Sequence, residues 1–371
     1  DSINAEEKSP VATITIGIDL SKQLFSVCEL DVSGRVMQRR DLRRDAFAAW
    51  LAQRPAGSIV AMEACSSAHH WARRCLGHRL QPRLIAAQFV KPFRKSQGAK
   101  NDRNDAEAIA TAARQGNMRF VPVKTVEQQA RLSWHRVREG YKAEALATGN
   151  RLRGLLSEFG IVIARSDAAL RRALGDDRVR SVLPQSLLPL VDDLQAHWQQ
   201  LHERVAAYDA TIAGHARNDE RCRRLQQVTG VGPLTADALV ATIGCARDFR
   251  NGRQLSAWLG LTPTQHSSGG RQRLGSISCR GDAYLRTLLI QGARSSLQRA
   301  KAVGRDKATA EQRWIQSLAM RLPFGKVLVA IASKHARQLW AMLARNENFD
   351  PDAWARHPMT QRSKSNHALA A

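Results

Sequence analysis

Apolar residues in the first third of the chain occur in short runs, each ending at a polar residue or a turn signal. Residues 13–19 alternate apolar and polar side chains, and this period of two predicts a strand with one buried face. Residues 58–62 are almost continuously apolar, which predicts a central strand buried on both faces. The other predicted elements are strands over 25–30 and 35–39 joined by a turn at 31–34, helices over about 45–53 and 67–79, and a strand over 82–87.

The order of these elements predicts the fold of the N-terminal part. Three antiparallel strands, then parallel strands joined by helices, then a helix starting near Asp102, are typical of a ribonuclease-H-like α/β domain. We therefore expect such a domain over residues 11–123. The polar segment before it, 1–10, is expected to be disordered.

The remainder of the chain has a helical pattern. From residue 124 to 217 apolar side chains recur at helical spacing with few glycines. A protruding helical hairpin or coiled coil that joins protomers or braces the domains explains this pattern, and so does an ordinary helical bundle segment; both stay open. We expect a third, mostly helical region over 222–345 and a polar tail over 346–371.

Charge narrows the class of partner. The 371 residues carry a formal net charge of +24, and the pI is about 10.9. Residues 222–345 contain 20 Lys and Arg against five Asp and Glu, so most of the surplus lies there. Such a surplus favours nucleic acid as the partner. Six scattered cysteines without a Cys-x-x-Cys pair argue against a disulfide framework or a zinc site, and no apolar run is long enough to predict a membrane span.

Four carboxylates give the clearest chemical signal. Asp19 and Glu63 stand at the ends of two predicted strands, and Asp102 and Asp105 open a predicted helix at a spacing that puts both on one face. Strand ends and a helix start can bring all four together, which is tolerable only with a cation among them. Oxygen ligands select Mg²⁺ or Mn²⁺, so the pattern predicts a metal site for phosphodiester chemistry.

Other polar residues near these acids are less specific. Lys22 and Lys100 would either contact a phosphate or offset the repulsion between the carboxylates. His69 and His70 form a pair on a helix surface without a carboxylate partner in the sequence pattern, which favours a structural role over metal binding.

A second candidate site lies in the basic third region. Residues 225–236 have the pattern helix, Gly-x-Gly turn, helix, with glycines at Gly230 and Gly232. This helix-hairpin-helix pattern presents backbone N–H groups to a phosphate of the nucleic-acid backbone. A plain glycine turn between packed helices is the alternative.

A Ser-Ser-Gly-Gly sequence beginning at Ser267 lies among arginines. By itself it indicates a surface turn. Serine can also accept a phosphoryl group when nearby cations lower its pKa, and His266 is a candidate for proton transfer beside it. The candidates for phosphate binding, each with a solvated surface role as the alternative, are Arg271, Arg273, Arg280 and Arg286.

Six short motifs recur together and in order. They are Gly17-Ile18-Asp19-Leu20-Ser21-Lys22, Met62-Glu63, Lys100-Asn101-Asp102-Arg103-Asn104-Asp105-Ala106, Thr229-Gly230-Val231-Gly232, Gly260-Leu261-Thr262-Pro263 and Ser267-Ser268-Gly269-Gly270. In this combination the chain resembles the DEDD transposases of bacterial insertion sequences, the group often called the one-ten family. The resemblance covers roughly residues 14–345. Each motif alone is weak, whereas six in order are specific.

The resemblance implies an activity. Members of that family resemble bridge-RNA-guided recombinases, in which a non-coding RNA pairs with donor and target DNA. It implies a RuvC-type N-terminal domain and a C-terminal transposase domain whose Ser268 forms a covalent phosphoserine link. Ser267 stands beside it, and the sequence alone does not choose between the two serines. The implied residues for Mg²⁺ or Mn²⁺ are Asp19, Glu63, Asp102 and Asp105.

The resemblance also implies an assembly. The expected protein is a homo-oligomer, a dimer or a tetramer, in which the acidic domain of one protomer faces the serine domain of another. It would be cytoplasmic, associated with the nucleoid and without a membrane partner. One departure is visible at Cys279, where the family pattern suggests a basic residue; one phosphate contact would be lost, while Arg280 and Arg286 remain.

Three hypotheses follow for the function. The first is an RNA-guided DNA recombinase that uses Ser268 and Mg²⁺. The second is a metal-dependent nuclease of the Holliday-junction-resolvase type, in which Ser268 is only a loop residue. The third, a non-catalytic nucleic-acid-binding protein, is disfavoured because all four acids are present. Only the first hypothesis predicts a covalent bond between the protein and a DNA end that survives denaturation.

Overall fold

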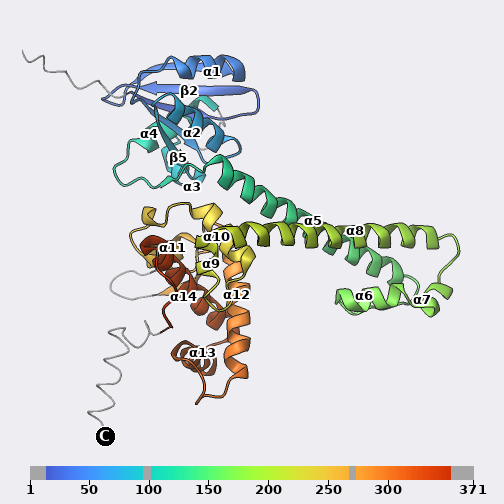
Figure 1. Ribbon diagram of the computed structural model, residues 1–371. Helices are drawn as coiled ribbons and strands as arrows, with labels where there is room; N and C mark the ends of the chain where they lie inside the picture. Colours follow the sequence, from blue (N-terminus) through green and yellow to red (C-terminus); the bar gives the residue numbers. More distant parts are fainter. Residues whose placement is uncertain (1–13, 95–101, 267–272, 352–371) are drawn as a thin grey trace, which may run out of the picture. The chain divides into compact units, whose positions relative to one another are not determined.

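The protein divides into two compact units, residues 1–126 and 127–371. A computed structural model describes residues 14–94, 102–266 and 273–351 (Figure 1). None of the helices among these described residues is long and apolar enough to cross a membrane. The expected further division of the second unit into a helical middle and a C-terminal region stays a prediction, as do the predicted segments 1–10 and 346–371 at the ends.

The first unit is a mixed α/β domain built on a six-stranded sheet of order β3-β2-β1-β4-β5-β6. The strands are β1 (Thr15–Asp19), β2 (Leu24–Leu30), β3 (Val36–Arg43), β4 (Ile59–Glu63), β5 (Gln81–Ile85) and β6 (Phe120–Val121). The first three pair antiparallel, and β4 and β5 continue the sheet in parallel with β1. The predicted change from antiparallel to parallel pairing is therefore confirmed. The short antiparallel edge strand β6 was not predicted.

Helices cover both faces of this sheet. They are α1 (Arg44–Ala52), α2 (Ala68–Gly77), α3 (Ala87–Val90) and α4 (Asp102–Ala113), with a 3-10 turn over Lys91–Phe93. One apolar core joins β1 to α1 and α2 through side chains such as Ile16, Phe47 and Trp71. The opposite face packs on α4 through Ile109 and its alanine neighbours. The sheet thus lies between two helical layers.

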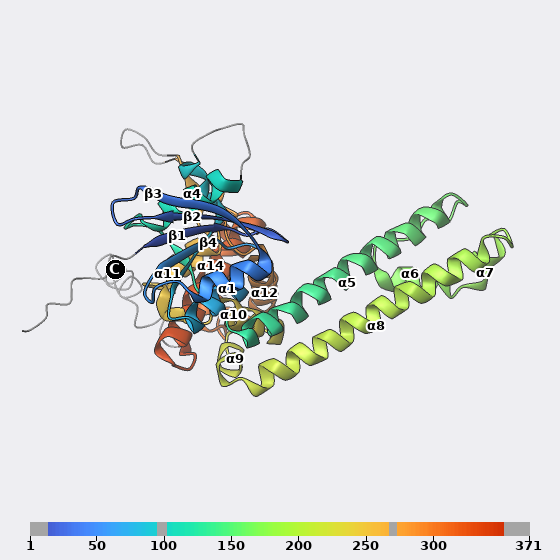
Figure 2. The same cartoon turned by 90° about the horizontal axis from the view of Figure 1, so that it is seen from above.

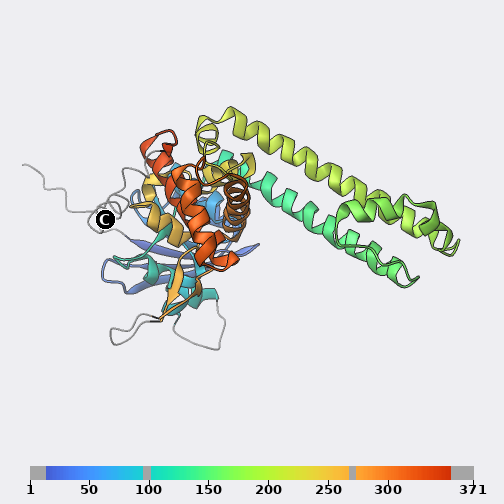
Figure 3. The ribbon, with the colours of Figure 1, turned by 90° about the horizontal axis from the view of Figure 1, so that it is seen from below.

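The second unit begins with two long helices. α5 (Val126–Ser157) and α8 (Leu188–Asn218) run side by side, with α6 (Asp167–Leu174) and α7 (Asp177–Ser181) at their far end (Figures 1, 2 and 3). Leu152, Leu170 and Trp198 belong to the apolar core that joins them. The predicted long helices of this segment are confirmed. A role in joining protomers stays a prediction.

A compact group of helices follows around one large apolar core. The elements are α9 (Glu220–Leu225), α10 (Pro233–Ile243), a 3-10 turn (Ala246–Asp248), α11 (Gly252–Trp258), β7 (Pro263–Gln265), β8 (Leu274–Ile277), α12 (Ala283–Ala302), α13 (Ala310–Arg321) and α14 (Phe324–Arg345). A buried polar network ties α5 to this group. Arg131 and His135 of α5 both contact Asp237 of α10, with 2.9 Å from His135 Nε2 to the carboxylate.

Candidate functional site

Side chains alternate between the two faces of the sheet along β1 and β4, and this places Asp19 and Glu63 on the face that packs against α4. On β1, Ile16 and Ile18 face α1 and α2, so Gly17 and Asp19 share the opposite face. On β4, Val60 and Met62 take the first face, while Ala61 and therefore Glu63 take the face of α4. Because β1 and β4 are parallel neighbours, both acids lie at the same edge of the sheet.

Gly17 brings α4 close to this edge. A Cβ on Gly17 would lie 2.1 Å from the carbonyl oxygen of Ala106 and 2.5 Å from the backbone nitrogen of Ala110. No side chain fits there, so only glycine permits this distance between strand and helix. The contact sets the first turn of α4, with Asp102 and Asp105, against the end of β1.

Two ion pairs tie α4 to β3. Arg103 donates to Asp41 from Nη2 and Nε, at 2.6 Å and 2.9 Å, and Glu107 pairs with Arg39. Hydrogen bonds from Arg103 and Ser26 lower the pKa of Asp41. These contacts fix the rotation of the helix about its axis, and with it the direction of its two leading aspartates.

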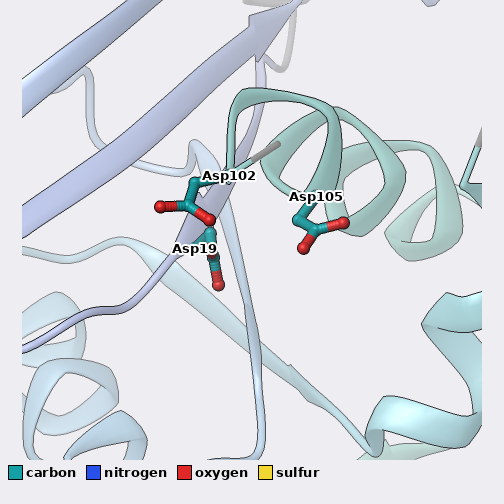
Figure 4. Close-up of side chains that lie close together, drawn as sticks. All are labelled: Asp19, Asp102 and Asp105. Atoms are coloured by element: carbon teal, nitrogen blue, oxygen red, sulfur yellow. The ribbon is translucent and has the colours of Figure 1, made fainter. Parts of the chain in front are cut away.

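Three of the four predicted acids meet. Asp19, Asp102 and Asp105 each offer a carboxylate oxygen, and these oxygens lie within 4.8 Å of one another (Figure 4). Asp105 is buried and Asp102 is exposed, so the cluster opens to solvent on one side. Glu63 lies outside this group of three. Arg94 bridges it to the cluster, with Nη2 at 3.4 Å from Glu63 and Nε at 3.0 Å from Asp105.

The electrostatics of the cluster favour a cation. Burial, followed by the charges of Asp102, Asp105 and Glu63, raises the pKa of Asp19 to about 6. Burial also raises the pKa of Glu63, and the guanidinium of Arg94 opposes that rise. A divalent ion would offset both the burial of these charges and the repulsion between them. The oxygen donors therefore fit Mg²⁺ or Mn²⁺.

Arg94 is one functional candidate that sequence reasoning missed. It follows the 3-10 turn Lys91–Phe93 and reaches two of the acids from there. Its position shortly before the acidic helix was the available signal. The predicted Lys100 lies outside the described residues, and Lys22 is an exposed residue between β1 and β2.

The predicted helix-hairpin-helix lies between α9 and α10, and its two glycines differ. Gly230 has φ +88° and faces α12, where a Cβ would lie 2.3 Å from the carbonyl oxygen of Gly292. Gly232 is exposed and meets nothing within 4 Å. Gly230 thus agrees with the packing interpretation and Gly232 leaves the start of α10 open, while phosphate binding at this turn stays a prediction.

A groove of about 680 Å³ runs beside this turn. It passes between the turn and α12, whose exposed polar side chains line it. Sequence reasoning missed those residues because their helical spacing shows only once α12 is seen packed against the turn. They are Gln291, Arg294, Ser295 and Gln298.

The predicted nucleophile falls in a gap between two paired strands. β7 and β8 pair antiparallel, with Gln265 opposite Leu274, and the backbone N–H of His266 donates to the carbonyl of Arg273 at 2.8 Å. Ser267, Ser268 and Arg271 lie outside the described residues. This strand pair was not predicted.

The arginines around this strand pair have different surroundings. Arg273 and Arg280 are exposed. Arg286 donates from Nη1 to the carbonyls of Leu259 and Arg280, both at 3.1 Å, so it braces the base of the strand pair. Their predicted phosphate contacts stay predictions, as does the effect of Cys279, which is exposed with φ +51°.

The histidine pair of α2 has local partners. Nδ1 of His69 accepts from the backbone N–H of Lys124 at 3.1 Å, which ties the helix to the end of the first unit. The ring of His70 packs against Trp71, and burial lowers the pKa of His70. These contacts agree with the structural role expected for both residues.

Comparison with known proteins gives matches over nearly the whole chain. A family model described as "Transposase IS116/IS110/IS902 family" matches residues 222–309, and a transposase model of the DEDD type of the IS110 group matches residues 16–161. A "Probable family 20 transposase" of Pseudomonas aeruginosa is 47% identical over 341 residues, which is 91% of this chain and 98% of the relative.

Two further relatives are similar at lower identity. The "Transposase for insertion sequence element IS1111A" of Coxiella burnetii is 38% identical, over 90% of each chain. The "Transposase for insertion sequence element IS1328" of Yersinia enterocolitica is 36% identical, over 90% of this chain and 98% of the relative.

Proposed function

The chain belongs to the IS116/IS110/IS902 family of transposases, and from this premise we propose that it exchanges DNA strands of an insertion sequence through a serine-bound intermediate. Transposases are enzymes that cut and rejoin DNA. The observation that carries the mechanism is the meeting of Asp19, Asp102 and Asp105 at one edge of the sheet. We assign the first unit to the ribonuclease-H-like fold of the RuvC type, a choice supported by its sheet order.

The acid cluster would bind the metal. DEDD transposases generally depend on a divalent metal ion, and the three aspartates offer the oxygen donors that Mg²⁺ or Mn²⁺ prefers. When bound, the ion stabilises negative charge on the attacking and leaving oxygens of a phosphodiester. Glu63 would complete the site, and Arg94 would orient Glu63 and Asp105 through its two contacts.

Ser268 would supply the nucleophile. In the proposed step its hydroxyl oxygen bonds to the scissile phosphorus and gives up its proton, with His266 as the nearest candidate base in sequence. The bond from phosphorus to the leaving sugar oxygen breaks, and that oxygen takes up a proton. A sugar hydroxyl of the second strand then attacks the phosphoserine and releases Ser268. The phosphoester bond is conserved throughout, so joining needs no ATP.

The basic second unit would bind the nucleic acids. Donor DNA, target DNA and a bridge RNA that pairs with both are the proposed partners, and the surplus of Lys and Arg over residues 222–345 supports binding of phosphates in all three. Gly232 and the polar residues of the α12 groove are proposed to contact one backbone, and Arg271, Arg273, Arg280 and Arg286 another. In the first unit, Lys22 and Lys100 are proposed to contact a phosphate beside the acids. Sequence choice would come from base pairing with the RNA.

A denaturing gel tests this function. Purified protein is incubated with candidate bridge RNA, labelled donor and target DNA, and Mg²⁺. Wild type should give a protein–DNA adduct that survives denaturation, and Ser268→Ala and Asp102→Ala should abolish it. Ser267→Ala and the exposed control Asp193→Ala should retain it.

The other outcomes are equally informative. Loss of the adduct in Ser267→Ala, with retention in Ser268→Ala, would move the nucleophile to Ser267. Cleaved DNA ends without a protein adduct in wild type would contradict the serine mechanism. Adduct formation that does not change when the RNA is omitted would exclude RNA guidance.

A further inference from the structure

A second cavity lies in the C-terminal group of helices, away from the turn at Gly230. It has a volume of about 510 Å³, is open to solvent, and is lined by the start of α11 and the C-terminal half of α14. None of its lining residues is shared with the groove beside α12. Its charged lining consists of Arg253, Lys334, Arg337 and Arg345, with Gln338 and Trp340 beside them. We call it the α11–α14 pocket.

The walls of this pocket are held firmly together. Ser256 of α11 and Ser333 of α14 are hydrogen-bonded at 2.9 Å. At Gly252 the two helices approach so closely that a Cβ would lie 2.8 Å from Cα of Arg337. The indole N–H of Trp340 donates to the carbonyls of Ala246 and Phe249, at 2.9 Å and 3.2 Å. The pocket is therefore a built feature of the fold.

The cations in the pocket crowd one another. Burial, followed by the charge of Arg337, lowers the pKa of Lys334, and burial followed by the charge of Arg253 lowers the pKa of Arg337. Holding like charges together in a half-buried place costs free energy that an anion would recover. Arg253 and Arg345 extend the positive charge to the exposed rim.

Two carboxylates lie near these cations. Glu311 of α13 interacts with Lys334 and accepts a hydrogen bond from Gln338 at 3.1 Å, while burial raises the pKa of Glu311. On the surface, Arg345 lies 3.9 Å from Glu347. Among the described residues that these contacts identify, the four cations outnumber the two carboxylates, which leaves a positive surplus at the pocket.

We propose that the α11–α14 pocket binds consecutive phosphates of a nucleic-acid strand. Lys334 and Arg345 are separated along α14 by about 16 Å at the usual helical rise, which is too long for a single phosphate and suits a polymer. Guanidinium groups bind phosphate oxygens in pairs, and here three of the four cations are arginines. The inference rests on the proposed function only for the identity of the polymer, DNA or RNA.

Fluorescence anisotropy with labelled single-stranded DNA, single-stranded RNA and duplex DNA tests the proposal. The assay contains EDTA and uses the Ser268→Ala background, so it reports binding whether or not the proposed chemistry is right. The pocket variant is Arg253→Gln/Arg345→Gln, which changes only exposed side chains. The matched control, Arg321→Gln/Lys326→Gln, removes the same charge from exposed positions of α13 and α14 outside the pocket.

The pocket variant should weaken binding by about tenfold, and the control by less than about twofold. Loss of two phosphate contacts should also lower the slope of log Kd against log salt by about 1.4 for a single strand. If only the affinity for RNA, or only that for DNA, is reduced, the pocket binds that polymer. If the affinity for all probes is reduced, the pocket binds either polymer. Equal effects of variant and control, or no effect, would overturn the proposal. Lys334→Gln is a second variant that probes the pocket's interior.

Discussion

Single residues determine how strongly the acid cluster holds a cation, and Arg94 is the most instructive of them. Its guanidinium lies within reach of Glu63 and Asp105, where it offsets carboxylate repulsion. In a bound complex it would share these carboxylates with a divalent ion. The charge of Arg94 should therefore oppose metal binding even while its contacts order the site.

We expect Arg94→Gln to bind Mn²⁺ about tenfold more tightly than wild type. Removing one positive charge beside two ligands makes the potential at the site more negative, and tenfold corresponds to about 1.4 kcal/mol. Isothermal titration calorimetry with Mn²⁺ measures the change. Arg74→Gln, which removes an exposed charge of α2 on the other face of the sheet, is the control and should change less. Weaker Mn²⁺ binding in Arg94→Gln would mean that the contact by which Arg94 orders Glu63 matters more for metal binding than its positive charge does.

A single residue, His335, should make folding stability depend on pH. This α14 side chain is 1% exposed, and its Nδ1 is buried without a hydrogen-bond partner in the described structure. Burial, with a contribution from Lys334, lowers the pKa of His335 to about 4, against 6.5 in the unfolded chain. The unfolded state therefore binds the proton first, and folding stability falls as pH drops from about 6.5 towards 4.

Replacing His335 should flatten this dependence. Between pH 7.5 and pH 5, the free energy of unfolding should fall by about 2 kcal/mol more in wild type than in His335→Gln, because the pKa of His335 differs between the folded and unfolded states. Urea unfolding at the two pH values measures this difference, and His197→Gln, at an exposed position of α8, is the control. Parallel losses in wild type and His335→Gln would show that this side chain is not responsible.

The sequence anticipated the identity of the acids better than their grouping. The strand ends and the i, i+3 spacing predicted that four acids would come together, and carboxylate oxygens of three of them, Asp19, Asp102 and Asp105, do lie close to one another. The link from Glu63 through Arg94 could not be predicted, because it depends on where the chain runs between β5 and α4.

Among the elements, the contact of β1 with α4 is the one on which the acid site depends. It places a helix backbone directly over Gly17, and the two leading aspartates follow from that placement. The strand and helix could be predicted from their patterns. Their distance could not, because a glycine in a strand signals close approach without naming the partner.

Gly17→Ala should therefore harm both stability and metal binding. Its Cβ would force α4 away from the sheet, at about 1–3 kcal/mol of folding free energy, and would separate Asp19 from the other two aspartates. Thermal unfolding and Mn²⁺ titration measure the two effects. Gly77→Ala is the control, since nothing lies within 4 Å of a Cβ there. If Gly17→Ala is destabilised but keeps its Mn²⁺ affinity, the contact between β1 and α4 is not what brings the aspartates together.

Short elements were the ones that the sequence did not reveal. β6 has two residues, and β7 and β8 have three and four, which is too few for alternation to be recognised. Long elements with a full apolar repeat, such as α5 and α8, were recognised as helical within the segment 124–217, although their separate bounds were not predicted. Periodicity needs several repeats before it exceeds chance.

On the scale of the whole molecule, the acids belong to one unit and the serine motif to the other. Strand exchange by the proposed mechanism needs both at one phosphodiester. We expect the acids of one protomer to act with the serine of another, as the family resemblance suggests, because an oligomer then holds two strands at once.

Mixing inactive variants tests this arrangement. Asp102→Ala and Ser268→Ala, each without adduct alone, should together regain about one quarter of wild-type adduct if they are exchanged into mixed dimers. Half of the dimers would then be mixed, and each would contain one intact pair. The DNA should be attached only to the Asp102→Ala chain, which a size tag identifies. No recovery in a demonstrated mixed dimer would place both groups in the same protomer.

The close contact between Gly230 and Gly292 has a consequence for distances along the bound strand. It fixes the helix-hairpin-helix turn to the middle of α12, and Arg286 fixes the base of the serine strand pair to the first turns of the same helix. In the proposed mechanism, α12 would therefore set the distance between a phosphate bound at Gly232 and the phosphate attacked by Ser268. Adding one residue to this helix between Arg286 and Gly292 would rotate its two ends relative to each other by about 100° and move them apart by about 1.5 Å. The cleaved phosphodiester should then move relative to the phosphate proposed to bind at Gly232.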